Sequence, residues 1–316
     1  MKNAQWKSTA PSNIALIKYM GKVPGALNQT VNPTLSYTLK HLLSEVELEI
    51  SPDDHDHFEL MPNSNLVLGG PQEKRFLSFL KQIKTKFNCD QNFIVRSKNN
   101  FPSDCGLASS ASSFAALTSA TVKAICDLQE KAPLSVQQMA LISREGSGSS
   151  CRSFFSPWGF WSEDSVSDLA LPYSQLHHMV FVVSKSIKKV SSSEAHKRVV
   201  TSALFEGRPQ RARLRLGQLV AAFQTKDWPK AYEICWTEFW DMHALFETST
   251  PSFGYILPET MEILNWIRDF WKMIGDGPIV TMDAGPNIHF LFRPDQKEMM
   301  ENFNTKWASK YQIIKN

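Results

Sequence analysis

Paired cysteines are missing from this sequence. Its cysteines number five in 316 residues, and no two of them form a CxxC pair: Cys89, Cys105, Cys126, Cys151 and Cys235. Disulfide frameworks and zinc ribbons both need paired, closely spaced cysteines, so neither is expected. Unpaired cysteines are typical of a reducing compartment, which predicts a cytoplasmic protein.

Long apolar runs and an excess of one charge are also missing. The longest apolar runs are far shorter than the ~20 residues that cross a membrane, and the first residues lack the apolar core of a signal peptide. The 34 basic and 31 acidic residues leave a formal net charge of +3, whereas nucleic-acid-binding domains usually concentrate a strong basic excess. We therefore expect neither a membrane partner nor a nucleic-acid partner.

The apolar residues that are present suffice for a large core. With 316 residues, 42% of them hydrophobic, the chain can bury its core in about two domains without disulfides or metals. Alternating and helical periods predict strands at 14–17, 35–39, 46–50, 57–61, 93–95, 178–183, 279–282 and 288–292. Helices are expected after Pro102, from a capping box at Ser135 and Gln138, at 73–87, 208–224, 227–246 and 258–274, and near the C-terminus before a short strand. This order predicts an α+β fold with two lobes, residues 1–186 and 187–316.

A segment rich in small and hydroxyl residues leads into the helix expected after Pro102. The free amides and the positive dipole end at a helix start attract phosphate. The hydroxyls of Ser109, Ser110 and Ser112 suit phosphate or magnesium. The same residues also fit a serine-capped helix that packs closely against a neighbour. Because the sequence has no P-loop and no GxGxxG motif, a nucleotide site here would belong to another class.

Two further segments have residues suited to anions and proton transfer. In the loop GSGSSCRS at 146–153, Arg152 can hold a carboxylate or phosphate through two parallel bonds. Asp283 stands where an apolar strand meets the turn DAGPN, and Lys18 follows another apolar strand. Taken singly, the loop also fits a mobile connection, Asp283 an Asx-type turn and Lys18 an ordinary surface lysine.

Other polar clusters favour structural roles. The turn at 53–57 has metal-ligand residue types but alternates them, so a metal site is not expected there. His177 and His178 stand at a strand entrance and favour surface and packing roles. The aromatic residues 236, 239 and 240 fit a buried helical face. Arginines at 208, 211, 213 and 215 are not confined to one helical face, which predicts a solvated helix.

Together these segments resemble the diphosphomevalonate decarboxylase family, in the GHMP kinase superfamily of galactokinase, homoserine kinase, mevalonate kinase and phosphomevalonate kinase. The likeness runs in register from about residue 8 to 292. It lies in APSNIALIKY at 10–19, NNFPSDCGLASSA at 99–111, GSGSSCRS at 146–153, VVS at 182–184, KKVSS at 188–192 and DAGPN at 283–287. It implies a GHMP-kinase-like fold with an N-terminal lobe like ribosomal protein S5 domain 2, a ferredoxin-like C-terminal lobe and an active site between them.

The resemblance also implies an activity in the mevalonate pathway of isoprenoid biosynthesis. The family phosphorylates the 3-hydroxyl of mevalonate 5-diphosphate with ATP and Mg2+, and phosphate and carbon dioxide then leave to give isopentenyl diphosphate. By resemblance, the catalytic residues are Asp283, Lys18 and Arg152. The substrate-binding residues are Tyr19, Lys22, Ser147, Ser149, Arg152 and Ser192. The ATP-binding residues are Ser97, Asn99, Gly106, Leu107, Ala108, Ser109, Ser110 and Ser112, with Ser110 as a magnesium ligand. A homodimer is expected.

The chain departs from the family pattern in its first substrate-facing segments. Met20 stands in place of an aromatic residue, Val23-Pro24 in place of a basic-acidic pair, and Asn32-Pro33-Thr34 in place of Asn-Ser-Ser. These departures leave open two sister activities, a mevalonate 5-phosphate decarboxylase and a mevalonate 3-kinase. A non-catalytic ligand-binding protein is a further alternative.

Overall fold

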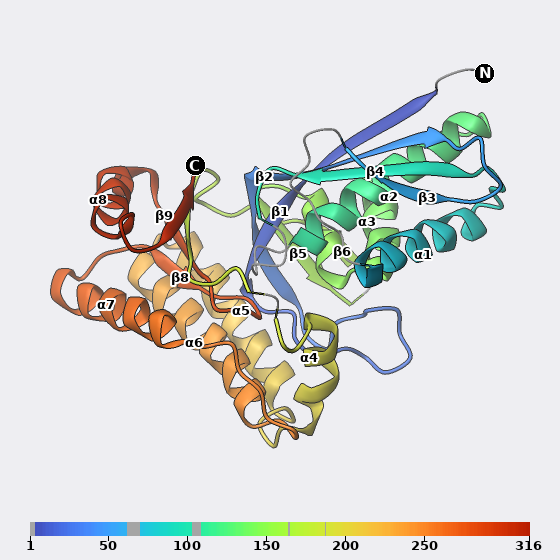
Figure 1. Ribbon diagram of the computed structural model, residues 1–316. Coiled ribbons are helices and arrows are strands. Elements are labelled where there is room, and N and C mark those ends of the chain that lie inside the picture. The colour runs from blue at the N-terminus through green and yellow to red at the C-terminus, as the bar shows by residue number, and fades with distance from the viewer. Residues whose placement is uncertain (1–3, 62–69, 103–108, 164, 187) are drawn as a thin grey trace.

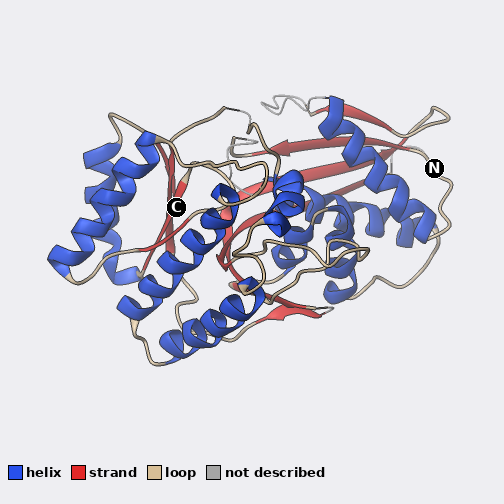
Figure 2. Ribbon diagram, turned by 90° about the horizontal axis from the view of Figure 1, so that it is seen from below, coloured by secondary structure: helices blue, strands red, loops and turns tan. Residues whose placement is uncertain are grey.

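Two sheets organise the chain (Figure 1). The computed structural model describes residues 4–61, 70–102, 109–163, 165–186 and 188–316. One sheet lies in the half that contains the N-terminus, and the other lies in the opposite half, beside the C-terminus (Figure 2). Helices pack against each sheet, so the α+β arrangement with two lobes agrees with the prediction.

The first sheet has six strands in the order β3-β4-β2-β5-β6, with β1 paired to β2. Neighbouring strands are antiparallel except β3 and β4, which are parallel. The strands are β1 Gln5–Ile17, β2 Thr34–Ile50, β3 His57–Leu60, β4 Phe93–Asn99, β5 Trp158–Ser162 and β6 Ser165–Asp168.

The strand β2 replaces two strands that the sequence predicts. The alternation of polar and apolar residues breaks between 39 and 46, but β1 pairs with β2 from Leu35 to Glu49 across this gap. One end of β2 also pairs with β5 and the other with β4. Because the partner strands supply the backbone hydrogen bonds, the chain stays extended where its own pattern is irregular. The prediction of two separate strands is wrong.

In the described part of the first lobe, three helices and one 3-10 helix accompany the sheet: α1 Gly70–Lys86, α2 Ser109–Leu128, α3 Val136–Gly146 and the 3-10 helix η1 Gly148–Phe154. Helix α2 lies directly on β1 and β2. Its alanines at 115, 116, 120 and 124 are fully buried, and their small side chains permit this close approach. The capping box predicted at Ser135 and Gln138 begins α3.

The second lobe pairs an antiparallel sheet with long helices. Its strand order is β10-β7-β9-β8, from β7 His177–Val182, β8 Ile279–Thr281, β9 Ile288–Phe292 and β10 Gln312–Lys315. The helices are α4 Ser192–Arg198, α5 Arg208–Gln224, α6 Trp228–Glu247, α7 Pro258–Ile274 and α8 Lys297–Trp307, with 3-10 turns η2 Val199–Thr201 and η3 Pro294–Gln296. Helix α7 ends as predicted at Gly275, which has the left-handed φ of 74°.

The strand β7 marks the division between the lobes. It pairs with β9 and β10, not with any strand of the first sheet. The chain therefore changes sheets between β6 and β7, before the predicted boundary near residue 186. We propose that the boundary between the two lobes lies between β6 and β7.

The lobes share an apolar core. Ile14 and Leu16 of β1 belong to the same cluster of buried side chains as Phe223 of α5 and Phe239 of α6. The end of β1 is therefore held against helices of the second lobe. Because Lys18 follows β1 directly, this packing places it at the junction of the lobes.

The prediction of a solvated arginine helix is wrong for Arg208 and Arg215 of α5. The side chain of Arg208 is 0% exposed and that of Arg215 is 14% exposed, whereas Arg213 is exposed. Carboxylates of the neighbouring helix α6, Glu238 and Asp241, pair with the buried guanidinium groups. Spacing along α5 alone does not reveal partners that another helix supplies.

The histidine at the entrance of β7 has a packing role. His178 is fully buried and lies between His41 and His289, with nitrogen–nitrogen distances of 3.1 and 2.9 Å. Asp53 and His55 on the turn before β3, and His57 at the start of β3, each place one potential ligand atom within 4.8 Å of the others.

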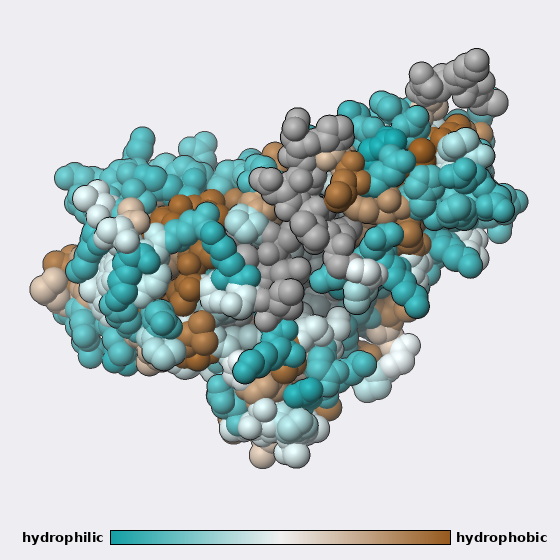
Figure 3. All heavy atoms as spheres, in the orientation of Figure 1, coloured by the Kyte–Doolittle hydropathy of each residue, from teal (hydrophilic) through white to brown (hydrophobic). Residues whose placement is uncertain are grey.

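The surface is mostly hydrophilic on the face in Figure 3, where apolar residues form separate small groups. Among the described residues, no helix combines the length and the apolar character that a membrane span requires.

Candidate active site

A cavity of about 320 Å³ lies where segments from both lobes meet. Its walls come from the segment after β1, the start of α2, η1, α4 and the turn between β8 and β9. All the residues predicted to be catalytic or to bind the substrate line it: Lys18, Tyr19, Lys22, Ser147, Ser149, Arg152, Ser192 and Asp283. The fold thus brings together the motifs that are widely separated in sequence.

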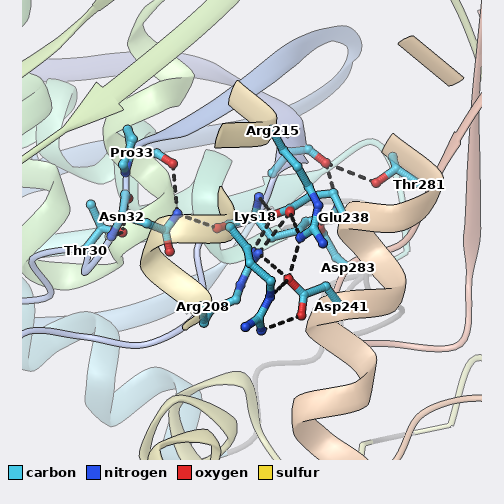
Figure 4. Close-up of polar contacts among 12 residues, drawn as sticks. Lys18, Thr30, Asn32, Pro33, Arg208, Arg215, Glu238, Asp241, Thr281 and Asp283 are labelled. Carbon is cyan, nitrogen blue, oxygen red and sulfur yellow. Dashed lines mark hydrogen bonds and ion pairs between the residues drawn. The ribbon is translucent and has the colours of Figure 1, made fainter. Parts of the chain in front are cut away.

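An ion pair between Lys18 and Asp283 joins the two lobes (Figure 4). The Lys18 ammonium donates to Asp283 Oδ1 at 2.8 Å and to the carbonyl oxygen of Ala15 at 2.6 Å. The lysine side chain is 1% exposed, while that of Asp283 remains 27% exposed. A carboxylate that is paired on one side and open on the other can also contact a ligand in the cavity.

Charge balance keeps Asp283 ionised. Burial alone would raise its pKa, but the positive charge and hydrogen bond of Lys18, together with His289 and Arg152, outweigh this effect and hold the pKa below its ordinary value. Burial lowers the pKa of Lys18, and Asp283 opposes that shift. The ionised Asp283 carboxylate can therefore accept a proton, and the Lys18 ammonium lies beside it.

Arg152 has a fixed position and free donor capacity. It is 3% exposed, and its Nη1 donates to Thr34 Oγ1 at 3.0 Å. Its Nε is buried and has no hydrogen-bond partner among the described residues. A buried donor without a partner is costly, and the guanidinium lines the cavity. Thr34, one of the departures from the family pattern, is thus the residue that holds this arginine.

A short loop organises the side that contains Tyr19 and Lys22. The Tyr19 hydroxyl donates to the Asn28 carbonyl at 2.9 Å, and Lys22 Nζ donates to Asn28 Oδ1 at 2.7 Å. Asn28 in turn donates to the carbonyls of Arg144 and Glu145. Gly148 is needed here, because a Cβ on it would lie 2.5 Å from the Tyr19 ring.

The predicted ATP-binding residues fall into three groups. Ser109 and Ser110, at the start of α2, line the cavity. Ser97, Asn99 and Ser112 are not among the residues that line it; Ser112 contacts Ser44 at 2.7 Å, and Ser44 also donates to Asn99 at 2.6 Å. Gly106, Leu107 and Ala108 lie outside the described residues. The nucleotide contacts of all these residues remain predictions.

The sequence did not indicate several residues that line the cavity: Asn28, Gln72, Arg75, His196 and Met242. Each is a single polar or apolar residue without a motif around it. His196 accepts a hydrogen bond from the Gly21 N–H at 3.0 Å through Nδ1, and its ring centroid lies 4.3 Å from that of Tyr19. Lys188 also lines the cavity. It stands in the segment KKVSS, so this motif could have indicated it as a site residue.

Two buried histidines, His196 in the cavity wall and His243 beside the Asp283 carbonyl, predict a loss of stability in weak acid. Burial lowers the pKa of His196 to about 3 and that of His243 to about 4. In the unfolded chain the pKa returns to about 6.5, so this state binds protons first as the pH falls. The stability they contribute is complete above about pH 6.5 and falls below it, by about 1.4 kcal/mol per pH unit for each histidine.

Urea unfolding between about pH 7 and 5 measures this slope. His196→Asn removes one titrating ring but keeps an acceptor for the Gly21 N–H, so a shallower slope is expected. An unchanged slope in this variant would show that His196 does not contribute.

Comparison with known proteins settles the family. Residues 10–170 match the model described as a diphosphomevalonate decarboxylase-like N-terminal domain, and residues 178–314 match a mevalonate 5-diphosphate decarboxylase C-terminal domain. The chain belongs to the diphosphomevalonate decarboxylase family. The cavity takes Lys18 and Arg152 from the first matched region and Ser192 and Asp283 from the second.

Known members of this decarboxylase family are similar over nearly the whole chain. Diphosphomevalonate decarboxylase ERG19 of Gibberella zeae is 31% identical in an alignment that is 318 residues long. The alignment covers 93% of this chain and 82% of that protein. The crystal structure of a mevalonate diphosphate decarboxylase from Legionella pneumophila is 46% identical, with a TM-score of 0.92 over 98% of this chain and 100% of that one.

A third relative is the structure of MDDEF in complex with MVAPP, AMPPCP and magnesium. It is 30% identical, with a TM-score of 0.87 over 99% of this chain and 96% of that one. The predicted family, the two-lobed α+β fold and the prediction of a diphosphomevalonate decarboxylase are thereby confirmed.

Proposed function

We propose that this decarboxylase uses ATP and Mg2+ to phosphorylate the 3-hydroxyl of mevalonate 5-diphosphate, and that phosphate and carbon dioxide then leave to give isopentenyl diphosphate. The observation that carries the proposal is the ion pair of Asp283 and Lys18 beside Arg152 in one cavity. The ligands of the related MDDEF structure, MVAPP, AMPPCP and magnesium, support the choice of substrate and nucleotide.

The reaction needs phosphorylation because hydroxide is a poor leaving group and phosphate a good one. The hydroxyl proton passes to Asp283 as the oxygen attacks the γ-phosphorus and ADP leaves. The C3–O bond then breaks and takes its electrons with the phosphate. Electrons of the bond between the carboxylate carbon and C2 form the C2–C3 alkene, and carbon dioxide departs.

Lys18 and Arg152 provide positive charge for different parts of this reaction. Lys18, paired with Asp283, keeps the carboxylate ionised and offsets charge on the transferring phosphoryl group. Arg152 holds the substrate carboxylate so that the C–C bond to be broken lines up with the departing phosphate. In phosphoryl transfer, positioning and electrostatics supply most of the catalysis, so no covalent enzyme intermediate is required.

The remaining wall residues divide between the substrate diphosphate and the nucleotide. Lys22, with the hydroxyls of Tyr19, Ser147, Ser149 and Ser192, binds the diphosphate, and all five line the cavity. Ser109 and Ser110 at the start of α2, together with Gly106–Ala108, hold the ATP phosphates. We propose Ser97 and Asn99 of β4 and Ser112 of α2 as further ATP contacts.

The residues present fit a magnesium ion. Magnesium prefers oxygen ligands, and the exposed Ser110 hydroxyl, which lines the cavity, offers one. We propose Ser110 as a ligand. When bound, the ion neutralises phosphate charge.

Replacing Arg152 by Lys tests the carboxylate grip. Lysine keeps the charge but cannot make two parallel bonds, so kcat/KM is expected to fall by the equivalent of about 1.5–3 kcal/mol. Steady-state kinetics measures this value. Unchanged kinetics would show that Arg152 has only a structural role through Thr34.

A panel of substrates tests the proposed reaction. Purified enzyme receives ATP and magnesium with mevalonate, its 5-phosphate or its 5-diphosphate, and both ADP and carbon dioxide are measured. We expect equal amounts of both products, with the diphosphate preferred. ADP without carbon dioxide would indicate a 3-kinase, and preference for the monophosphate would indicate the sister decarboxylase. Light scattering of the same preparation tests the proposed homodimer.

A further inference from the structure

The backbone of Lys18 is held by a carboxylate that no sequence motif indicates. The ladder between β1 and β2 ends with the pair Ile17 and Leu35, so the next amide, that of Lys18, has no strand partner. Instead the Lys18 N–H donates to Glu238 Oε1 at 2.9 Å, across the junction of the lobes. The Lys18 carbonyl accepts from Asn32 Nδ2 at 3.1 Å. Both backbone groups of this lysine therefore have side-chain partners.

Arginines of α5 hold Glu238 in this position (Figure 4). The carboxylate is 0% exposed. Its Oε2 accepts from Arg208 Nη1 and Arg215 Nη1, each at 2.9 Å, and its Oε1 accepts from Arg208 Nη2 as well as from Lys18. Asp241, one turn along α6, binds the same arginines. A buried carboxylate is stable only when it is paired and hydrogen-bonded in this way.

The arrangement fixes the lysine at three points. Its N–H is held by α6, its carbonyl by the segment before β2, and its ammonium by Asp283. A lysine side chain has a limited length, so the anchor point of the Lys18 backbone limits where its ammonium can lie. Glu238 is not among the residues that line the cavity, and it contacts the site at the Lys18 N–H.

We propose that Glu238 is a positioning residue for the decarboxylase reaction. Held by hydrogen bonds from Arg208 and Arg215, it determines where the Lys18 ammonium meets Asp283. This inference rests on the proposed function, because it assumes that Lys18 and Asp283 do the chemistry.

The charge of Glu238 also acts on the ammonium. Burial lowers the pKa of Lys18, and the negative charges of Asp283 and Glu238 raise it. Glu238 itself faces Arg208 and Arg215 of α5. Around Lys18 and Asp283, further titratable or charged groups are Cys235 and His243 on α6, Arg152 on η1 and His289 on β9. Loss of the Glu238 charge therefore lowers the pKa of Lys18 further. Because activity needs the protonated ammonium, the alkaline limb of the pH profile moves to a lower pH.

Two substitutions separate the bond from the charge. Glu238→Asp keeps the charge beside the arginines but is one methylene too short for the Lys18 N–H, so kcat is expected to fall about 10-fold with the alkaline limb of the pH profile unchanged. Glu238→Gln removes the charge, so kcat falls by about 10–100-fold and the alkaline limb moves down by about 1 pH unit. KM for the substrate changes less than kcat in both variants.

A matched control breaks a similar ion pair elsewhere. Lys84 and Asp56 are 2.8 Å apart and 9% and 14% exposed, and neither lines the cavity. Asp56→Asn is expected to lower the melting temperature while kcat and the alkaline limb stay those of the parent enzyme. A purely structural role of Glu238 would reproduce this control pattern, and such a result in both folded Glu238 variants would overturn the proposal.

A milder variant covers the case in which neither Glu238 variant folds. Arg215 lies at the edge of the cluster with 14% exposure, and Arg215→Gln removes one donor to Glu238. A fall in kcat with little change in KM supports the proposal, and parental kcat and pH profile overturn it. The parent enzyme must first produce ADP and carbon dioxide; its failure to do so would refute the proposed function and not the role of Glu238.

Discussion

Asp283→Asn is expected to lower turnover by at least about 10²–10⁴-fold, the usual contribution of a general base. Asparagine has almost the same shape, but it cannot accept the hydroxyl proton at the reaction pH or form an ion pair with Lys18. The carboxylate is accessible from the cavity on one side and bound to the ammonium at 2.8 Å on the other. The measurement is kcat from carbon dioxide release, with substrate binding followed separately by calorimetry.

A surface aspartate of the same lobe serves as the control. Asp295 is 66% exposed and pairs with Arg293, away from the cavity. Asp295→Asn is expected to keep parental turnover. If Asp283→Asn also turned over at nearly the parental rate with a normal melting temperature, Asp283 would have no part in the chemistry.

Lys18→Met is expected to have the second largest effect, a fall in kcat of about 10²–10³-fold. Methionine has a similar length but no charge, so the transferring phosphoryl group loses a cation. The pKa of Asp283 also rises, because the positive charge of Lys18 is one of the effects that hold it below its ordinary value. Activity requires the ionised carboxylate, so the acid limb of the pH profile moves to higher pH. Steady-state rates across the acid range measure both effects.

The control for this variant is Lys310→Met. Lys310 pairs with Glu262 on the surface of the second lobe and is 51% exposed. Its loss is expected to change neither kcat nor the acid limb. An unshifted acid limb in Lys18→Met would contradict the view that Lys18 keeps Asp283 ionised, even if turnover fell.

Local pattern predicted the regular elements well where local forces determine them. The helices α5 and α7 begin and end at the predicted residues, because helical period, proline near the start and, for α7, Gly275 at the end all act within a few residues. The strand β9 also has its predicted bounds. The short strands β5 and β6 were missed, since Trp158–Ser162 and Ser165–Asp168 are extended by pairing with β2 and with each other.

The candidate site was predictable where its residues stand in motifs. Lys18, Arg152 and Asp283 could be proposed from three separate segments, and the structure brings all three to one cavity. Asn28, His196 and Glu238 could not, because each acts through a contact with a residue distant in sequence. For Arg208 the sequence even indicated the wrong environment, since its partner Glu238 lies on another helix.

The amino-acid sequence alone determined the family, the α+β class and the chemical groups available, because composition, period and motif spacing are properties of neighbouring residues. Only the tertiary structure decided that a lysine near the start of the chain meets an aspartate near its end, and that a buried glutamate anchors this lysine. Such contacts depend on how β1 packs against α6 and on which charges become buried together. Burial raises the energetic cost of an unpaired charge, so packing determines which residues must become partners.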